Sequence, residues 1–282
     1  MEIIAGVKEM QRQAQQLQKE GKTIAFVPTM GYLHEGHLSL MREGRKRGDV
    51  LIISIFVNPT QFGPGEDYEK YPRDMKRDLK LAQKVGVDIV FTPSVQEMYP
   101  TRFQTSVEVE KVTKNLCGIS RPHHFRGVTT VVAKLFNIVK PHLALFGQKD
   151  YQQLVTIKRM VGDLNMDIEI IGMPTVREAD GLAMSSRNAY LNPKKRKAAQ
   201  SLYRSLLMGE ELFRQGTRSA KVILQKIREI IEAEKSAQID YAKICDPQTL
   251  EDIEEIEDEA VIALAVRIGR TRLIDNLILK EG

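Results

Sequence analysis

An unbroken run of apolar, mostly β-branched residues from Val50 to Val57 constrains the fold of this chain more than any other feature. A strand that is apolar on both faces has to be covered on both faces, which is the situation of a central strand in a parallel sheet. The run ends at Asn58-Pro59, where proline offers no N–H for strand pairing. The sequence therefore predicts a sheet with helices on both of its faces.

Segments with strand and helix patterns alternate around this run. Further strands are predicted at 24–27, 88–91 and 142–146, and helices at 37–47, 67–84 and 131–139. Strand–helix–strand units with right-handed crossovers build a doubly wound, Rossmann-like α/β sheet, which binds ligands at the carboxyl ends of its strands. Met30, Asn58 and Gly147 each follow one of these strands, so we expect them at one cleft.

The pattern changes after the apolar run Ile168–Ile171. Long amphipathic segments predict helices at 193–215 and 220–235, and they are followed by strand patterns at 239–245, 260–267 and 271–278. These features predict two domains, a Rossmann-like domain at 1–175 and a smaller α+β domain with an antiparallel sheet at 176–282.

Composition limits the cellular setting and leaves the ligand open. A hydrophobic content of 42% is enough for a substantial core, and no apolar run approaches the roughly 20 residues that span a bilayer. Cys117 and Cys245 lie far apart and lack a CxxC partner, which argues against disulfides or structural zinc and favours the cytoplasm. The net charge of +5 suits an enzyme of polyanionic small molecules as well as a nucleic-acid binder.

The segment Pro28–His37 is a turn with several glycines, and it carries His34 and His37 at the start of a helix. A helix N-terminus presents free N–H groups and the positive end of a dipole to a phosphate, and imidazoles can donate hydrogen bonds to phosphate oxygens. Histidines that only cap the helix are the alternative. A zinc-protease motif does not fit, because it needs histidines four residues apart on one helical face.

A second polar segment, Asp180–Asn188, combines the hydroxyls of Ser185 and Ser186 with the guanidinium group of Arg187. Arginine matches phosphate oxygens with a planar fork of donors, so such a loop can close over phosphates. Taken alone, such a segment is more often an ordinary polar linker.

Together, the two segments resemble the HIGH and KMSKS signatures of the nucleotidylyltransferase superfamily. Four segments resemble, in order and spacing, the pantothenate synthetase (pantoate–β-alanine ligase) family, and the resemblance covers nearly the whole chain: Phe26–His37, Ser54–Gly63, Phe146–Gln153 and Val176–Asn188. Gln148 departs from the pattern, since glutamate is expected there in many relatives.

The resemblance implies a two-step ligase reaction. Pantoate attacks the α-phosphorus of ATP, which carries Mg²⁺, to give pantoyl adenylate and pyrophosphate, and β-alanine then displaces AMP to give pantothenate. It also implies a cytoplasmic homodimer that binds pantoate, β-alanine and ATP, with no nucleic-acid or membrane partner. The domain at 1–175 would bind ATP and pantoate, and the domain at 176–282 would act as a lid.

The resemblance also implies roles for individual residues. His37 is the expected catalytic acid, assisted by His34, Lys149, Ser185 and Arg187. Gln61 and Gln153 are expected to hold pantoate, with Gln61 also near β-alanine, and no protein ligand of Mg²⁺ is assigned. The expected ATP-binding residues are Met30, Gly31, Tyr32, Leu33, His34, Glu35, Gly36, His37, Gly147, Gln148, Lys149, Asp150, Val176, Met184, Ser185, Ser186 and Arg187.

The chemistry of these side chains agrees with the implied roles, because fixed positive charge on a transferring phosphoryl group matters more than a protein base. Both glutamines offer an acceptor and two donors without a charge that would repel pantoate. A mixed anhydride hydrolyses when water reaches it, so a cover is expected, and Gly63–Asp67 is a candidate lid.

Two other functions remain open at this point. On the same fold, a nucleotidylyltransferase would join ATP to a phosphorylated precursor, but it would need a further basic cluster at the cleft. A nucleic-acid-binding module is suggested by Lys194–Lys197, although this cluster lacks the interleaved aromatic residues of a base-stacking surface.

Overall fold

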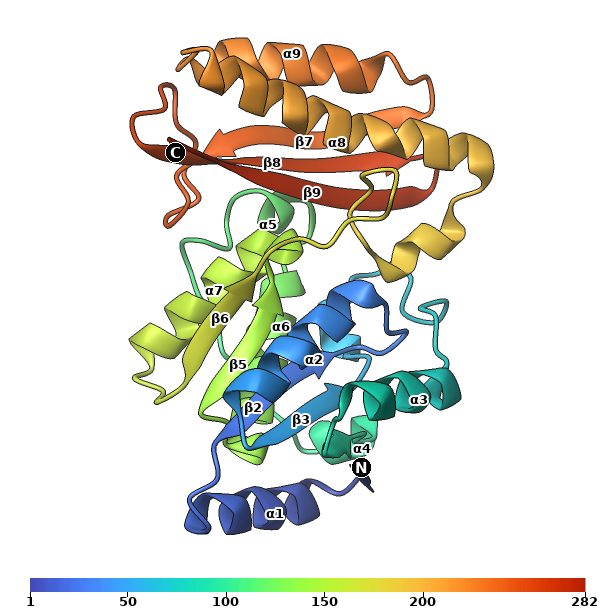
Figure 1. The fold of residues 1–282 in the computed structure, drawn as a ribbon, viewed down its shortest axis with the longest axis vertical. Helices are drawn as coiled ribbons and strands as arrows, with labels where there is room; N and C mark the ends of the chain where they lie inside the picture. Colours follow the sequence, from blue (N-terminus) through green and yellow to red (C-terminus); the bar gives the residue numbers. More distant parts are fainter. Residues whose placement is uncertain (282) are drawn as a thin grey trace. The chain divides into compact units, whose positions relative to one another are not determined.

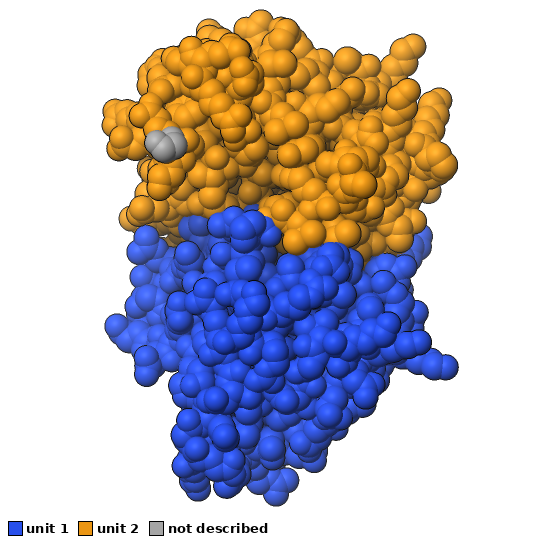
Figure 2. Space-filling view, in the orientation of Figure 1, with its two compact units in different colours: residues 1–109, 121–148, 153–174 blue, residues 110–120, 149–152, 175–282 orange. Residues whose placement is uncertain are grey.

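The computed structural model of the chain describes residues 1–281 and divides into two compact units (Figure 2). The first unit comprises 1–109, 121–148 and 153–174, and the second comprises 110–120, 149–152 and the chain from Thr175 onward. The segments 110–120 and 149–152 lie inside the predicted first domain, 1–175, but they group with the second unit rather than with the first. Gly282, the last residue of the predicted second domain, lies outside the described residues.

The first unit is built on a six-stranded sheet in the order β1-β4-β3-β2-β5-β6, in which every neighbouring pair is parallel (Figure 1). The predicted central run is buried in β3, which lies between β2 and β4. The doubly wound α/β fold is therefore confirmed. The strands are β1 (Glu2–Ile4), β2 (Ile24–Thr29), β3 (Val50–Ile55), β4 (Ile89–Phe91), β5 (Leu143–Gly147) and β6 (Glu169–Met173).

Helices cover both faces of this sheet. On one face, Val27 and Ile53 pack with Met41 of α2 and Ala82 of α3, and on the other face the ring of Phe26 meets that of Phe136 in α6. The helical segments are α1 (Val7–Lys19), α2 (Glu35–Arg47), η1 (Pro59–Gln61), α3 (Met75–Val85), α4 (Val95–Met98), α6 (His124–Val139), η2 (Gln148–Asp150) and α7 (Tyr151–Asp163).

The helix predicted at 67–84 is wrong in its first half, because α3 begins only at Met75. Pro72 biases Tyr71 away from helical dihedral angles, and Asp74 caps the helix by accepting a hydrogen bond from the Arg77 N–H at 3.0 Å. The short edge strand β1 was not predicted, whereas residues 131–139 lie in a helix as predicted, within α6, which begins at His124.

The second unit contains a three-stranded antiparallel sheet in the order β7-β8-β9, as predicted, and two long helices. Leu202 of α8, Ile223 of α9 and Ile262 of β8 belong to one buried cluster. Helix α8 begins where Asn192 accepts a hydrogen bond from the Lys195 N–H, with Pro193 as its first residue. The elements are α5 (Cys117–Ser120), η3 (Ser186–Tyr190), α8 (Pro193–Arg214), α9 (Ala220–Glu232), β7 (Ala237–Cys245), β8 (Glu259–Ile268) and β9 (Thr271–Lys280).

Among the helices of residues 1–281, none combines the length and the apolar character that crossing a membrane requires.

Substitution of alanine for two helical glycines should change the stability of the protein in opposite directions. A Cβ at Gly162 of α7 would meet no atom within 4 Å, whereas a Cβ at Gly209 of α8 would lie 2.7 Å from Ile262 Cδ1 and 3.2 Å from side-chain atoms of Ile223 and Ile227. We expect Gly162→Ala to raise stability by up to about 1 kcal/mol through helix propensity. Gly209→Ala should lower it by about 1 kcal/mol, because overpacking outweighs the same propensity gain.

Thermal unfolding of the two variants, followed by calorimetry, measures both changes. A stabilising Gly209→Ala substitution would show that α8 does not approach β8 as closely as the structure indicates.

Candidate active site

The turn that joins β2 to α2 has a left-handed backbone at two successive residues. Gly31 has φ +80° and Tyr32 has φ 50°. A Cβ at Gly31 would lie 2.9 Å from Ile55 Cγ2 and 3.0 Å from Asp78 Oδ2, so glycine is required both by the dihedral angle and by the space. His34 then takes the N-cap position of α2, and its carbonyl accepts a hydrogen bond from the Leu38 N–H at 3.0 Å.

The carboxylate of Asp78, which is only 1% exposed, holds this turn in place. Its two oxygens accept the N–H groups of Tyr32 and Leu33 at 2.7 and 2.8 Å. Burial raises the pKa of Asp78 above its ordinary value, and the two backbone hydrogen bonds act in the opposite direction. The neighbouring Arg77 donates to the Leu33 carbonyl at 2.9 Å, so the first turn of α3 clamps the β2–α2 turn.

Sequence reasoning missed Asp78, because an aspartate in the first turn of a helix is ordinary and nothing in the sequence connects it with residues 45 positions away.

The two histidines of the turn lie against each other. The His34 N–H donates to His37 Nδ1 at 3.3 Å, and the ring centroids are 4.0 Å apart. A neutral imidazole that accepts at Nδ1 carries its proton on Nε2. This hydrogen bond therefore selects the tautomer in which His37 Nε2 is a donor.

Gln61, the last residue of η1, contacts the same turn. Its Nε2 lies 3.1 Å from Met30 Sδ, and its Oε1 accepts from Asn58 Nδ2 at 3.1 Å. Asn58 is 1% exposed, and its side chain also donates to the Gly127 carbonyl of α6 at 3.1 Å. The sequence placed Asn58 at this edge of the sheet, but it did not indicate that Asn58 fixes the amide of Gln61.

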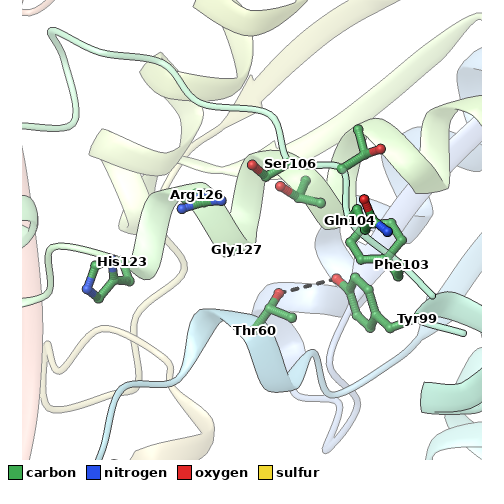
Figure 3. Close-up of a pocket in the computed structure, with 10 residues that line it drawn as sticks. Thr60, Tyr99, Phe103, Gln104, Ser106, His123, Arg126 and Gly127 are labelled. Atoms are coloured by element: carbon green, nitrogen blue, oxygen red, sulfur yellow. Dashed lines mark hydrogen bonds between the residues drawn. The ribbon is translucent and has the colours of Figure 1, made fainter. Parts of the chain in front are cut away.

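A cavity of about 360 Å³ opens beside Thr60, on the α6 side of η1. Figure 3 shows Tyr99 hydrogen-bonded to Thr60 on one side of it, and His123 and Arg126 on the other. The Tyr99 hydroxyl also donates to Asn58 Oδ1 at 2.8 Å, and burial raises the pKa of Tyr99, which keeps this donor protonated. The wall of the cavity is thus continuous with the hydrogen bonds that hold Gln61.

The candidate lid Gly63–Asp67 is tied down within the first unit. The Glu66 carboxylate pairs with Arg121 through Nε at 2.5 Å and Nη2 at 2.6 Å, and it accepts the Gly63 N–H at 3.1 Å. Although burial raises the pKa of Glu66, the hydrogen bond and charge of Arg121 outweigh it and leave that pKa below its ordinary value. Arg121 Nη2 and His124 Nδ1 also contact the Gln61 carbonyl, at 3.2 and 2.9 Å.

The predicted site segment after β5 divides between the two units. Gly147, Gln148 and Gln153 belong to the first unit, and Gln153 is half-buried in α7. Lys149 and Asp150 belong to the second unit, where their side chains lie 3.6 Å apart. The carbonyl of Lys149 accepts a hydrogen bond from Asn276 Nδ2 of β9 at 2.8 Å.

In the second unit, Val176–Met184 forms a small hairpin ahead of the predicted phosphate loop. The Met184 N–H donates to the Val176 carbonyl at 3.0 Å, and Arg177 pairs with Ala183 in an antiparallel bridge. Ser185 then caps η3, with its hydroxyl accepting the Arg187 N–H at 3.2 Å. The hairpin thus sets the start of the Met184–Arg187 loop.

The described residues offer little to a metal ion by themselves, because residues 1–281 contain no group of three or more His, Cys, Asp or Glu side chains that could hold one. Mg²⁺ prefers oxygen ligands and keeps several waters when it is bound to substrate phosphates. The carboxylate of Asp150, close to Lys149, is the kind of ligand that suits such an ion.

Comparisons with known proteins give one consistent result. A family model described as pantoate-beta-alanine ligase matches residues 2–278. The pantothenate synthetase of Syntrophus aciditrophicus (strain SB) is 63% identical over 281 residues, covering 100% of this chain and 98% of that protein. The pantothenate synthetase of Desulfatibacillum aliphaticivorans is 59% identical over 280 residues, covering 99% and 100%.

Solved structures agree with these sequence relatives. The pantothenate synthetase of Thermus thermophilus is 48% identical, with a TM-score of 0.93 over 98% of this chain and 99% of that one. The pantoate-beta-alanine ligase of Francisella tularensis, complexed with beta-gamma ATP and beta-alanine, is 35% identical, with a TM-score of 0.81 over 100% and 99%.

The clamp on the β2–α2 turn predicts a change in nucleotide affinity. In Asp78→Asn, the amide nitrogen cannot accept a hydrogen bond, so the N–H of Tyr32 or Leu33 loses its partner at a cost of about 1–3 kcal/mol. If this turn binds ATP, the dissociation constant of ATP should be about tenfold higher for Asp78→Asn than for the wild type in calorimetric titrations. The matched control is Asp74→Ala, which removes the side-chain cap of the same helix without touching the turn, and it should change the affinity less than about twofold.

Equal losses of affinity in both variants would contradict the clamp, because they would reflect the stability of α3 alone.

Proposed function

The chain belongs to the pantoate–β-alanine ligase family, and from this premise we propose which of its residues carry the reaction. The family match across residues 2–278 is the observation that supports the activity. The protein is an AMP-forming ligase that condenses (R)-pantoate with β-alanine. The pantoate carboxylate displaces pyrophosphate from ATP, and the amine of β-alanine then attacks the acyl carbon of pantoyl adenylate and releases AMP.

His37 acts on the phosphates as a hydrogen-bond donor in this proposal. Its Nδ1 accepts the His34 N–H, so its Nε2–H is the group available to a phosphate oxygen. A carboxylate nucleophile brings no proton that a base has to remove, and stabilisation of the charge that develops on phosphorus is the larger requirement. We assign the Met30–His37 turn to ATP on this ground, with His34 as the partner that sets the tautomer.

Gln61 and Gln153 are the proposed pantoate ligands. The amide of Gln61 is held by Asn58 and Met30, which supports a fixed orientation toward a substrate that carries hydroxyl groups and a carboxylate. Gln153 supplies a second neutral amide from α7. Neutral amides bind a carboxylate without lowering its nucleophilicity through a full ion pair.

The remaining ATP-binding residues that we propose come from the end of β5 and from the segment around the Met184–Arg187 loop. Gly147 ends β5 and Gln148 follows it, both in the first unit. In the second unit, Val176 would contact the adenine through its backbone, and Lys149, Ser185 and Arg187 would neutralise the charge of the phosphates. Mg²⁺ would arrive with the triphosphate and screen its charge, and Asp150, beside Lys149, would offer a carboxylate to its bound waters. The other ATP contacts proposed in this unit are Met184 and Ser186.

Two properties of the whole protein complete the proposal. We assign it to the cytoplasm, where ATP and small soluble acids are available, and we propose that it is a homodimer. Light scattering of the purified chain would give twice the 32.0 kDa mass of one chain if the dimer assignment holds.

A comparison of two substitutions at His37 tests its role. Pantoate-dependent exchange of labelled pyrophosphate into ATP should be present in the wild type and should fall by about 10²–10⁴ in His37→Ala. In His37→Gln the amide nitrogen takes the approximate position of Nε2 and donates without transferring a proton. We expect His37→Gln to be at least about tenfold faster than His37→Ala.

Equal rates in these two variants would favour proton transfer by His37, and an absence of exchange in the wild type would contradict the ligase activity itself.

The Glu66–Arg121 pair, which holds Gly63–Asp67, is the proposed seal over the adenylate. Glu66→Gln removes the negative charge that attracts Arg121. The segment should therefore open more often, and water should reach the intermediate more often. With ATP and pantoate but no β-alanine, we expect AMP to appear several times faster than in the wild type, and proteolysis at this segment should be faster too.

The contribution of ionised Glu66 to stability is present above its ordinary pKa of 4.5 and is lost as the pH falls through the lower pKa of the folded state.

The matched control for this seal is Glu43→Gln, since Glu43 pairs with Arg47 on the exposed side of α2. If AMP release rises equally in both variants, the seal is not located at Glu66.

A further inference from the structure

We propose that Asp275 and Asn276 of β9 are positioning residues for adenylate formation. Asn276 holds the backbone of Lys149, and Asp275 holds Arg177, which lies in the hairpin that precedes the Met184–Arg187 loop. The inference rests on the proposed function, in which Lys149 and this loop act on the phosphates of ATP. All of these residues belong to the second unit.

Asn276 holds the backbone of Lys149. Its Nδ2 donates to the Lys149 carbonyl at 2.8 Å, and its side chain is 8% exposed. Two neighbours of Lys149 are attached to the same unit: the Tyr151 hydroxyl donates to the Pro247 carbonyl at 3.1 Å, and Gln152 Oε1 accepts the Cys117 N–H at 3.0 Å. The segment 149–152 is therefore fixed to this unit through several independent hydrogen bonds.

Asp275 holds the hairpin that precedes the loop. Its carboxylate, in a residue that is 3% exposed, accepts hydrogen bonds from both terminal nitrogens of Arg177 at 2.7 and 2.9 Å. Such a bidentate pair fixes the guanidinium plane as well as its position. Burial raises the pKa of Asp275, while the hydrogen bonds and charge of Arg177 oppose this, so the carboxylate depends on its arginine partner.

Arg177 transmits this position to the hairpin. Its Nη1 donates to the Gly181 carbonyl at 3.1 Å, and the guanidinium carbon lies 4.0 Å from the centre of the Tyr203 ring. Arg177 also pairs with Ala183, the residue before the loop begins at Met184. The residue whose guanidinium group Asp275 holds thus also pairs, through its backbone, with the residue directly before the loop.

The two attachments are consecutive residues of a regular strand. Asp275 and Asn276 pair with Leu264 and Ala263 of β8 without a register shift, and Asp275 Oδ1 also accepts the Asn276 N–H at 2.8 Å. The Lys149 carbonyl and the Arg177 guanidinium group are therefore attached to adjacent positions of one strand. Charges that stabilise a transition state are effective when they are held in place before the reaction begins, and β9 provides this arrangement for both groups.

Measuring the rates of the two half-reactions separately distinguishes this positioning role from simple support of the fold. Asn276→Leu keeps the shape of the side chain but removes the donor to Lys149. Pantoate-dependent pyrophosphate exchange, which needs the phosphate-binding groups, should slow by about tenfold or more through kcat. Release of AMP from supplied pantoyl adenylate by β-alanine involves no pyrophosphate departure, and it should stay within about twofold of the wild type.

A second variant acts on the other attachment. Arg177→Lys keeps a positive charge beside Asp275 but cannot form the bidentate pair, so it should slow the exchange reaction selectively in the same way. The matched control is Ile262→Val in the core of the same unit, which should lower the melting temperature without changing the ratio of the two half-reaction rates.

The outcomes are distinct from those that test the proposed function. If the wild type catalyses exchange and both variants lower the two half-reactions equally, or leave both unchanged, the positioning role is wrong while the ligase activity stands. If the wild type shows no exchange, the proposed function fails first. Circular dichroism of Asn276→Leu establishes that it folds, and if it does not, Arg177→Lys decides the question.

Discussion

Strand β2 pairs with β3 on one side and with β5 on the other, and the functional groups of the first unit depend on this parallel arrangement. Parallel pairing aligns the carboxyl ends of the strands, so the three segments that follow them start from one edge of the sheet. Only a sheet that is covered on both faces tolerates such apolar strands, which is why α2 and α6 are as necessary to the site as its own side chains.

Much of this organisation was predictable, because the apolar periodicity of strands and helices is local and strong. The run from Val50, the antiparallel C-terminal sheet and the family resemblance all followed from residues that are close together in the sequence. The failures have both local and non-local causes. Residues 67–74 have the composition of a helix but contain Pro72, and β1 is too short to show a period. Asp78 looks like an ordinary helix residue until the turn that it contacts is known.

Buried charge is used in two different ways in this protein. Asp78 is surrounded by backbone N–H groups, so its cost of burial is offset by dipoles that the chain has to satisfy in any case. Asp275 relies instead on the guanidinium group of Arg177, a partner that a single substitution can remove. The first arrangement fixes a stretch of backbone. The second fixes a side chain, which suits the hairpin before the Met184–Arg187 loop, because that hairpin is held at the single residue Arg177.

The division of the chain into units has a consequence for how the protein can have been assembled. The backbone passes between the units five times, at 109/110, 120/121, 148/149, 152/153 and 174/175. A unit made from discontinuous pieces cannot be excised with one pair of cuts, because a fragment that starts at Thr175 lacks both Cys117 and Lys149. The C-terminal part alone is therefore not a complete module that a single pair of cuts could transfer between enzymes.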